Sequence, residues 1–516
     1  MPRKKPDITT QSFWLTSLGC KVNQYDGNAV AKLLHDRRWH LASSPESAGL
    51  LVINTCCITT TAMRKSRQTV AKAIRRSPDA AVIVIGCYSD YDGERLTRLV
   101  GSFGLLPNRF AVFGHHDDLP ARIGLFIDSI STKGSSALAA LFPAAASQPD
   151  GNRYDLSMSV SGQASGPVTS LNPTSIKARR NAAVKRIVST SNTLRRIDRF
   201  AGHSRAFVKV QDGCDAMCSY CIVPYTRARV WSKTIQEIEQ ECRELVNAGH
   251  REIVLCGVFL GAFGQRTAVR RKWEKPTSHP LAELVSRVAE MDGLWRVRLS
   301  SLSPGDVTDE LLEVCSRLSR FAPHLHLPLQ SGSGRILKRM NRQYSAQDYL
   351  DAAERIKKAF DRPAITTDII VGFPGELDED FTETLEVARR CGFAKIHAFP
   401  FSPIEPTPAW TWRREMPSRQ VVAARMSELR RLERQLARQY RRQFVGQTME
   451  ALVEGNNNHP DQGRFAMTDR YFRANFETCD DLSTGKVVEL LIAEASSNHV
   501  SADLVNTRAR ATAEQA

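Results

Sequence analysis

The sequence has no apolar run of the ~20 residues that a membrane-spanning helix needs. Its first residues, Met1–Pro6 and the polar Asp7–Gln11, also lack the apolar core of a secretory signal peptide. Acidic residues are scarce: 55 Asp and Glu stand against 71 Lys and Arg, which gives a net charge of +16. We therefore expect a cytoplasmic protein with no membrane partner and an affinity for polyanions. Charge alone leaves open a basic protein that binds no nucleic acid.

Cysteine, by contrast, is plentiful, with twelve residues in a chain of 516. Thiols of cytoplasmic proteins stay reduced, so this number indicates metal binding or catalysis rather than disulfides. A chain of this length is expected to form two or three domains, each with its own core.

Apolar runs alternate with helix-like stretches at the start of the chain, which predicts a small parallel α/β sheet domain over residues 10–125. The segments are Ser12–Cys20, Gly27–Arg38, Leu50–Cys56, Thr61–Arg76, Ala80–Cys87 and Phe110–Gly114. Three of the runs end on a cysteine, namely Cys20, Cys56 and Cys87. Ligands bind beyond the carboxyl ends of such strands, so these thiols are expected to converge on one site. The alternative is that they are small buried hydrophobes.

Residues 126–198 are rich in Ala, Ser, Thr, Gly, Pro and basic residues, which predicts a disordered insert. Six strand-like runs then alternate with amphipathic segments: Ala206–Val210, Glu252–Val258, Arg296–Leu302, His324–Leu329, Ile365–Gly372 and Lys395–Phe401. This alternation predicts an open (β/α)₆ barrel within residues 199–440. Active residues should lie at the carboxyl ends of its strands.

The sharpest motif is a CxxxCxxC formed by Cys214, Cys218 and Cys221, directly after the first barrel strand. Three thiolates on a 4Fe-4S cluster leave one iron open to chelate S-adenosylmethionine. An electron from such a cluster cleaves this cofactor to methionine and a 5′-deoxyadenosyl radical, which abstracts hydrogen from an unactivated carbon. A structural zinc site is the alternative, but zinc usually takes four ligands and the sequence offers no evident fourth. A second alternative is an iron–sulfur cluster with a purely structural role.

An arginine-rich helix follows Trp412, with Arg430, Arg434, Arg438 and Arg442 spaced four apart on one face. Residues 443–506 then show short alternating runs broken by Asn, Asp and Gly, which predicts a small β-barrel. The arginines are expected to contact RNA phosphates, although a solvated helix face is the alternative.

In this order, the three parts resemble the methylthiotransferase family of radical S-adenosylmethionine enzymes, over everything except the insert and the two ends. That family ends in an RNA-binding β-barrel called TRAM. The resemblance implies two 4Fe-4S clusters: an auxiliary cluster on Cys20, Cys56 and Cys87 that takes part in sulfur donation, and a radical cluster on Cys214, Cys218 and Cys221. The family's Asn-Thr-Cys pattern at Asn54–Cys56 selects Cys56 over its neighbour Cys57.

The amino-acid sequences of two segments, Gly19–Asp26 and Arg64–Gln68, are similar to those of one branch of the family. This branch acts on N6-threonylcarbamoyladenosine beside the tRNA anticodon. The isopentenyladenosine branch usually has Gln-Met-Asn-Glu after its first cysteine, and the ribosomal-protein branch has Pro-Lys-Asn. Neither pattern matches this chain.

The resemblance implies three partners: tRNA, a flavodoxin- or ferredoxin-like electron donor and a sulfur source. Methylthiolation of isopentenyladenosine or of a ribosomal protein is the second interpretation. A non-catalytic iron–sulfur RNA-binding protein is the rival of another class.

Further barrel segments also look like the family: Arg298–Ser301, His326–Ser333, Asp368–Glu376 and Phe399–Ser402. Since they follow predicted strands, their polar and glycine groups are candidates to receive S-adenosylmethionine. The candidates from these segments are Ser300, Gln330 and Gly372, and Gly257 is a fourth because glycine permits close backbone approach. Each is equally compatible with ordinary loop architecture. After Phe-Ser-Pro the family tends to have Arg and Gly, whereas this chain has Ile404 and Pro406.

Overall fold

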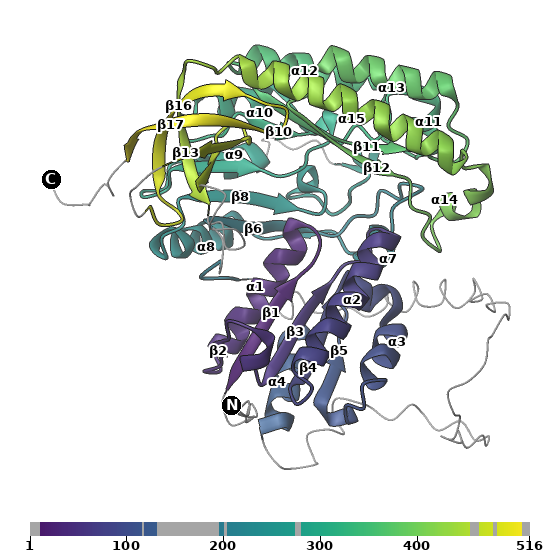
Figure 1. Ribbon diagram of the computed structural model, residues 1–516, viewed down its shortest axis with the longest axis vertical. Helices are drawn as coiled ribbons and strands as arrows, with labels where there is room; N and C mark the ends of the chain where they lie inside the picture. Colours follow the sequence, from purple (N-terminus) through teal and green to yellow (C-terminus); the bar gives the residue numbers. More distant parts are fainter. Residues whose placement is uncertain are drawn as a thin grey trace.

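Three parts make up the molecule in the computed structural model (Figure 1). The described residues are 11–115, 118–131, 196–200, 204–273, 280–454, 464–477 and 482–507. An N-terminal sheet domain packs below a central barrel, and a small C-terminal barrel covers one end of the central one. In the described part of the chain, no helix is both long and apolar enough to cross a bilayer.

The N-terminal domain is a five-stranded parallel sheet in the order β2-β1-β3-β4-β5. Its strands are β1 (Ser12–Ser17), β2 (His40–Leu41), β3 (Leu50–Thr55), β4 (Ala81–Gly86) and β5 (Phe110–Val112). Its helices are α1 (Lys21–His35), α2 (Thr60–Arg76), α3 (Cys87–Gly101) and α4 (Leu119–Ser131). Every residue of β3 and β4 is buried, as expected for central strands covered on both faces. The predicted parallel sheet is confirmed.

Two boundaries differ from the sequence prediction. Helix α1 begins at Lys21 rather than near Gly27, because the chain turns directly from the end of β1 into the helix at Cys20. The predicted insert of residues 126–198 starts too early, since α4 runs to Ser131 and buries Phe126 against the domain core. It also ends too late, because Ile197 is already buried in the core. The remainder of the insert, residues 132–195, lies outside the described residues.

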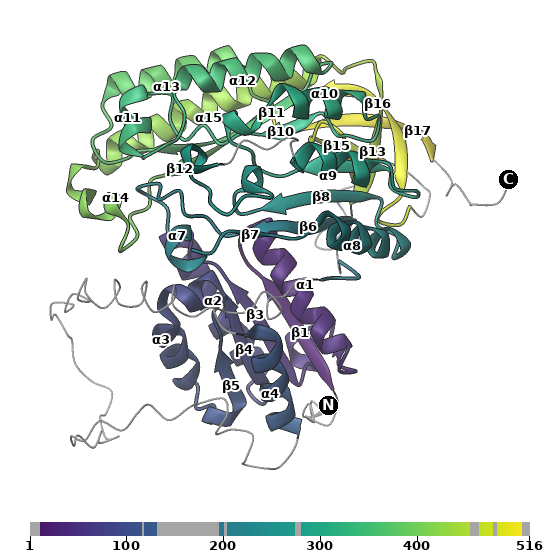
Figure 2. The same cartoon turned by 180° about the vertical axis from the view of Figure 1, so that it is seen from behind.

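The central part is an open barrel of six parallel strands, as predicted (Figure 2). The strands are β6 (Arg205–Asp212), β8 (Glu252–Gly257), β9 (Arg296–Leu299), β10 (His324–His326), β11 (Ala364–Val371) and β12 (Lys395–Pro400). Single parallel bridges, Val297 to Phe321 and Ser301 to His326, join the β6-β8-β9 ladder to the β10-β11-β12 ladder. In the part of the chain that the structure describes, no ladder closes β12 onto β6. A short strand, β7 (Trp231–Ser232), pairs antiparallel with the end of β6.

Helices follow the strands of this barrel and cover its outer face, except α7, which packs against α3 of the N-terminal domain. They are α7 (Val223–Thr226), α8 (Ile235–Asn247), α9 (Pro280–Ala289), α10 (Asp309–Arg317), α11 (Gly334–Arg339), α12 (Ala346–Ala359), α13 (Asp378–Cys391), α14 (Pro408–Thr411) and α15 (Arg419–Arg442). Several begin with a capping box, for example Thr234 with Glu237 in α8 and Ser345 with Asp348 in α12. Such caps satisfy the first N–H groups of a helix and fix where it starts.

The C-terminal part is a closed barrel in the order β13-β14-β15-β17-β16, which confirms the predicted small β-barrel. Its strands are β13 (Thr448–Glu454), β14 (Arg464–Thr468), β15 (Arg473–Phe476), β16 (Val487–Ala495) and β17 (His499–Thr507). It is anchored at the amino ends of the central strands. There Arg205 pairs with Glu454 at 2.6 Å, and the Trp295 indole donates to Glu450 at 2.9 Å. The N-terminal domain instead packs along the side of the central barrel, where α1 lies next to β6 (Figure 1).

The loop after β12 makes part of that contact. Ser402 Oγ accepts the backbone N–H of Thr60 at 3.0 Å, and Ile404 is buried in an apolar cluster formed mainly by the N-terminal domain. An arginine at position 404 would place a charge in this apolar contact. The departure from the family pattern at Ile404 thus has a structural reason, because this side chain packs in the interface between the central barrel and the N-terminal domain.

Candidate active site

The first cysteine set lies at the carboxyl edge of the N-terminal sheet, where three neighbouring strands end. Cys20 caps α1 after β1, Cys56 directly follows β3, and Cys87 directly follows β4. A Cβ atom built on Gly19 would lie only 2.8 Å from Cys56 Sγ, so the loop before Cys20 presses against the Cys56 thiol. The backbone at Gly19 has φ of +97°, which glycine adopts without strain. The structure thus brings these cysteines together as the strand pattern predicts.

Two side chains brace the loops that carry these thiols. The Asn23 amide donates to the carbonyls of Leu18 at 2.7 Å and Thr55 at 2.9 Å, which ties the loop after β1 to the end of β3. Ser66 Oγ lies 3.0 Å from both the backbone N–H and the carbonyl of Cys56. Both residues stand in the segments that resemble the family, but their bracing role depends on partners that the sequence does not reveal.

Cys56 and Cys57 face different surroundings, although they are neighbours in the chain. Burial raises the pKa of Cys56 to about 12, and the nearby thiols of Cys87 and Cys20 add to the rise. Cys57 is fully buried in an apolar cluster and its thiol donates to the backbone carbonyl of Cys87 at 3.3 Å. Cys57 is therefore engaged by packing, whereas Cys56 lies near the thiols of both Cys87 and Cys20.

The second cysteine set, Cys214, Cys218 and Cys221, lines a pocket of about 120 Å³ beyond the end of β6. Its other lining residues are Ala216, Tyr220, Val223, Val258, Phe259, Ser303, Arg342, Gln343 and Tyr344. The loop is held at both ends. The Cys214 N–H donates to the carbonyl of Arg227 at 2.9 Å, and the Asn341 amide donates to that of Met217 at 2.9 Å.

Two further contacts fix the shape of this loop. The Asp215 carboxylate accepts from Thr267 Oγ1 at 2.7 Å and from the N–H of Ala268 at 2.6 Å. A Cβ on Gly213 would lie 1.7 Å from the carbonyl oxygen of Arg229, so only glycine fits before Cys214. The three thiols are thus presented by a rigid loop rather than a free one.

The donor set of this pocket fits an iron–sulfur cluster. Among the described residues no carboxylate or histidine lines it, and three thiols with one open side match a three-cysteine 4Fe-4S site. No three His, Cys, Asp or Glu side chains of the described residues are close enough to hold a single metal ion. A four-iron cluster binds each cysteine at a different corner, so its ligands stand farther apart than those of one ion. Burial raises the pKa of Cys214 to about 12, and bound iron offsets this cost because it binds the thiolate.

The four residues expected to contact S-adenosylmethionine all lie on the carboxyl side of the central barrel. Gly257 ends β8, Ser300 follows β9, Gly372 follows β11, and the backbone N–H of Gln330 donates to Asp368 of β11 at 2.8 Å. Ser300 Oγ is buried with no hydrogen-bond partner within the described part of the protein, which fits a contact to a bound cofactor.

Two of the four are engaged by the protein itself. The Gly372 N–H donates to Glu376 at 3.0 Å, and a Cβ on Gly257 would lie 2.9 Å from Gln211 Oε1. The close approach expected at Gly257 is therefore to the chain's own Gln211.

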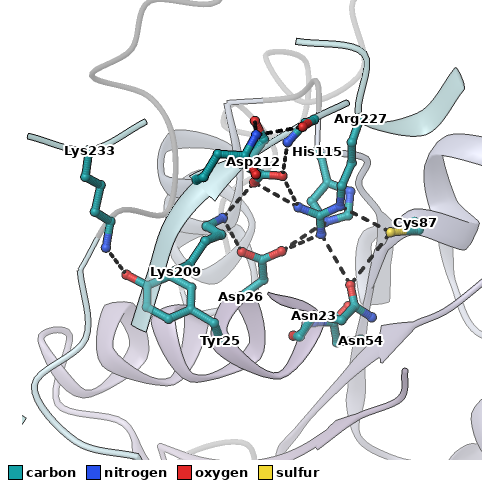
Figure 3. A network of polar contacts seen from close by, with 12 residues as sticks. Asn23, Tyr25, Asp26, Asn54, Cys87, His115, Lys209, Asp212, Arg227 and Lys233 are labelled. Carbon is teal, nitrogen blue, oxygen red and sulfur yellow. Dashed lines mark hydrogen bonds and ion pairs between the residues drawn. The ribbon is translucent and has the colours of Figure 1, made fainter. Parts of the chain in front are cut away.

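A buried charged network lies beside Cys87, where α1 of the N-terminal domain meets β6 of the central barrel (Figure 3). Lys209 of β6 pairs with Asp26 of α1 at 2.6 Å and with Asp212 at 2.9 Å. Arg227 pairs with the same two carboxylates, at 2.5 Å and 2.9 Å. Although burial alone opposes ionisation of Asp26, Lys209 and Arg227 outweigh it and hold its pKa well below the usual range. This network was not predicted, because its members come from two domains and, apart from Asp26 in the segment Gly19–Asp26, lie outside the quoted motifs.

The arginine face of α15 borders a groove of about 940 Å³ between this helix and the β16–β17 hairpin. Its lining includes Arg434, Arg438 and Arg442 from the helix, with His499 from the hairpin and Glu494 as an acidic member. Arg430 is exposed on the same helix but does not line the groove. The structure therefore places three of the four predicted arginines side by side on an open surface.

Comparison with protein families finds two matches that coincide with the first two parts of the fold. The Radical SAM superfamily matches residues 208–388, which hold the CxxxCxxC motif and most of the central barrel. The Uncharacterized protein family UPF0004 matches residues 12–105, which hold Cys20, Cys56 and Cys87.

Curated relatives match nearly the whole chain. Threonylcarbamoyladenosine tRNA methylthiotransferase MtaB of Chlamydia pneumoniae is 32% identical over 86% of this chain and 87% of its own. The protein of the same name from Bacillus subtilis is 30% identical over 93% of both chains. The tRNA-2-methylthio-N(6)-dimethylallyladenosine synthase of Carboxydothermus hydrogenoformans is also 30% identical, over 96% of this chain and all of its own.

Among solved structures, the radical S-adenosylmethionine methyltransferase TsrM of Kitasatospora setae, with cobalamin and a [4Fe-4S] cluster bound, has a TM-score of 0.50. The match covers 78% of this chain and 74% of that one, at 14% identity. At this identity the likeness concerns the fold alone.

Proposed function

Because the chain belongs to the methylthiotransferase family of radical S-adenosylmethionine enzymes, we propose that it adds a methylthio group to carbon 2 of N6-threonylcarbamoyladenosine in tRNA. Members of this family use S-adenosylmethionine and two 4Fe-4S clusters. The observation that carries the proposal is the presence of two separate three-cysteine sites, one in each of two domains packed together.

We assign the auxiliary cluster to Cys20, Cys56 and Cys87 and the radical cluster to Cys214, Cys218 and Cys221. When bound, the radical cluster would supply the electron that cleaves S-adenosylmethionine, and the auxiliary cluster would take part in sulfur donation. The chain's own residues hold the thiols in place, and Val223, Val258 and Phe259 give the pocket of Cys214, Cys218 and Cys221 an apolar wall. The buried Ser300 hydroxyl supports the assignment of this residue as a contact to S-adenosylmethionine. We propose Gly257, Gln330 and Gly372, at the same end of the barrel, as further contacts.

The choice of nucleoside rests on the sequence around Cys20. The segments Gly19–Asp26 and Arg64–Gln68 have sequences similar to those of the threonylcarbamoyladenosine branch. The relatives from Chlamydia pneumoniae and Bacillus subtilis are both named threonylcarbamoyladenosine tRNA methylthiotransferase. N6-dimethylallyladenosine is the second candidate substrate, since the relative from Carboxydothermus hydrogenoformans is as similar and is aligned over its full length.

The proposed reaction needs three macromolecular or small-molecule partners besides S-adenosylmethionine. The tRNA is expected along the arginine groove of α15, where phosphate contacts supply affinity without sequence information. An electron donor of the flavodoxin or ferredoxin type and a source of sulfur complete the set.

Mass spectrometry of tRNA nucleosides from the source organism, with and without this gene, tests the proposal. We expect the methylthio form of threonylcarbamoyladenosine to disappear and to return with the wild-type gene but not with Cys218→Ala. Loss of the methylthio form of dimethylallyladenosine instead would keep the chemistry and change the substrate. Unchanged levels of both, together with tRNA binding by the purified protein, would favour a non-catalytic iron–sulfur RNA-binding protein.

A further inference from the structure

We propose that Arg227 is a positioning residue that links the two cluster sites and raises the reduction potential of the auxiliary cluster. The inference rests on the proposed assignment of Cys87 to that cluster. Arg227 belongs to the central domain, whereas Cys87 belongs to the N-terminal one, so the contact crosses the domain interface.

Arg227 touches both cysteine sets at once. Its Nε lies 3.3 Å from Cys87 Sγ and donates to this sulfur, while its carbonyl oxygen accepts the N–H of Cys214 at 2.9 Å. The side chain is buried, with 4% of its surface exposed. One residue thus joins the thiol of the first site to the backbone of the second.

The remaining N–H groups of the guanidinium lock it in this orientation (Figure 3). Nη1 donates to both Asp212 oxygens at 2.9 Å, and Nη2 donates to Asp26 at 2.5 Å. Lys209 binds the same two carboxylates, and His115 contacts Asp26 and Asp90 beside Arg227 Nη2. Although burial opposes the charged form of His115, Asp90 and Asp26 raise its pKa to about 10, so three cations face three carboxylates. With its other N–H groups held, the guanidinium cannot turn its Nε away from Cys87 without leaving a buried carboxylate short of donors.

A hydrogen bond and a positive charge at a cluster sulfur stabilise the reduced form of the cluster relative to the oxidised form, because the reduced form carries one more negative charge. Contacts of this kind to cysteine sulfur are a recognised way in which proteins raise the reduction potential of an iron–sulfur cluster. Arg342 has the corresponding position at the other site, with Nη1 at 3.1 Å from Cys218 Sγ. Each cysteine set therefore has an arginine, and the one at Cys87 comes from the opposite domain.

The experiment uses the full chain with Cys214, Cys218 and Cys221 changed to Ala, so that the auxiliary cluster alone remains after anaerobic reconstitution with iron and sulfide. The potential of this cluster is measured by a redox titration followed by electron paramagnetic resonance. Arg227→Met is expected to shift the potential to a more negative value. Arg227→Lys keeps the positive charge but loses the planar set of N–H donors of the guanidinium. We therefore expect a smaller shift of the reduction potential, again to a more negative value.

Because Arg227→Met leaves an unpaired buried carboxylate, a charge-balanced pair of variants accompanies it. Arg227→Met with Asp212→Asn keeps the buried network neutral and is compared with Asp212→Asn alone, so the two differ in Arg227 only. Lys233→Met is the interface control: Lys233 contacts Tyr25 across the same domain interface and Glu241 within its own domain. Among the described residues it has no hydrogen bond to a cysteine of either set. Its cluster is expected to keep the parent potential.

Equal potentials in the charge-balanced double variant and in Asp212→Asn, at equal iron content, would overturn the role of Arg227. An equal negative shift in Lys233→Met would also overturn it, because loosened domain packing would then explain the change. Failure of the parent triple-alanine protein to assemble any cluster would instead refute the assignment of Cys20, Cys56 and Cys87, and the inference with it.

Discussion

At the scale of single residues, the surroundings of a thiol decide whether it binds metal or packs. Cys56 and Cys57 are adjacent and both buried, yet Cys57 donates to a carbonyl inside an apolar cluster while Cys56 lies near the thiols of Cys20 and Cys87. The sequence pattern selected Cys56 through the resemblance alone. These surroundings support the same choice, which stays a prediction.

We predict that Cys56→Ala removes the auxiliary cluster and that Cys57→Ala retains it. In the triple-alanine background, iron and acid-labile sulfide per chain should fall to background for the first variant and stay at the parent value for the second. The matched pair controls for the loss of a buried sulfur atom. Retention of iron in Cys56→Ala together with its loss in Cys57→Ala would exchange the two roles.

Residues that act through distant partners escaped the sequence analysis. The CxxxCxxC motif is local and could be recognised from eight residues, and the strand-end cysteines followed from the β-α-β rhythm. Asn23, Ser66 and Arg227, in contrast, have partners that become neighbours only after folding. Arg227 has no local signal, because a lone arginine after a short helix is ordinary in sequence.

At the scale of elements, the groove between α15 and the β16–β17 hairpin is the strongest candidate for phosphate contacts. We predict that Arg438→Gln weakens tRNA binding and lowers the slope of log affinity against log salt concentration by about 1. Arg431→Gln is the matched control, since Arg431 is exposed on the same helix but does not line the groove. Binding measured at several salt concentrations distinguishes them, and equal slopes in the two variants would remove the groove from the tRNA site.

The elements themselves were predicted well where they are long and periodic. The six central strands and the arginine-rich helix follow from hydrophobic alternation, whereas β14 and the two-residue strands β2 and β7 were missed. Short edge strands depend on pairing with a neighbour more than on their own sequence, so a single-sequence pattern carries little information about them.

At the scale of the whole molecule, buried charges couple the N-terminal domain to the central barrel. Asp26 of α1 is surrounded by Lys209, Arg227 and His115, and its side chain has 2% of its surface exposed. Neither the orientation of the two domains nor this network follows from the sequence, since both depend on the packing of surfaces far apart in the chain. Each domain alone was predictable, but their interface was not.

Asp26 also gives this interface a dependence on pH. Its pKa is lowered in the folded protein, so the stabilisation is present above the pKa of an unfolded aspartate, about 3.9, and is lost as the pH falls through the folded value. We predict that Asp26→Asn costs roughly 3–5 kcal/mol near neutral pH. This difference from wild type should shrink below pH ~4. Thermal unfolding of both proteins across this range tests it, and a difference independent of pH would contradict the assignment.

The most direct test of the proposed chemistry follows one hydrogen atom. Reconstituted protein is reduced in the presence of S-adenosylmethionine and a tRNA whose N6-threonylcarbamoyladenosine carries deuterium at carbon 2, and the nucleosides and 5′-deoxyadenosine are analysed by mass spectrometry. We predict a methylthio nucleoside without that deuterium and 5′-deoxyadenosine that has gained it, with neither product in Cys218→Ala. Cleavage of S-adenosylmethionine without deuterium transfer and without a methylthio nucleoside would contradict the proposed function.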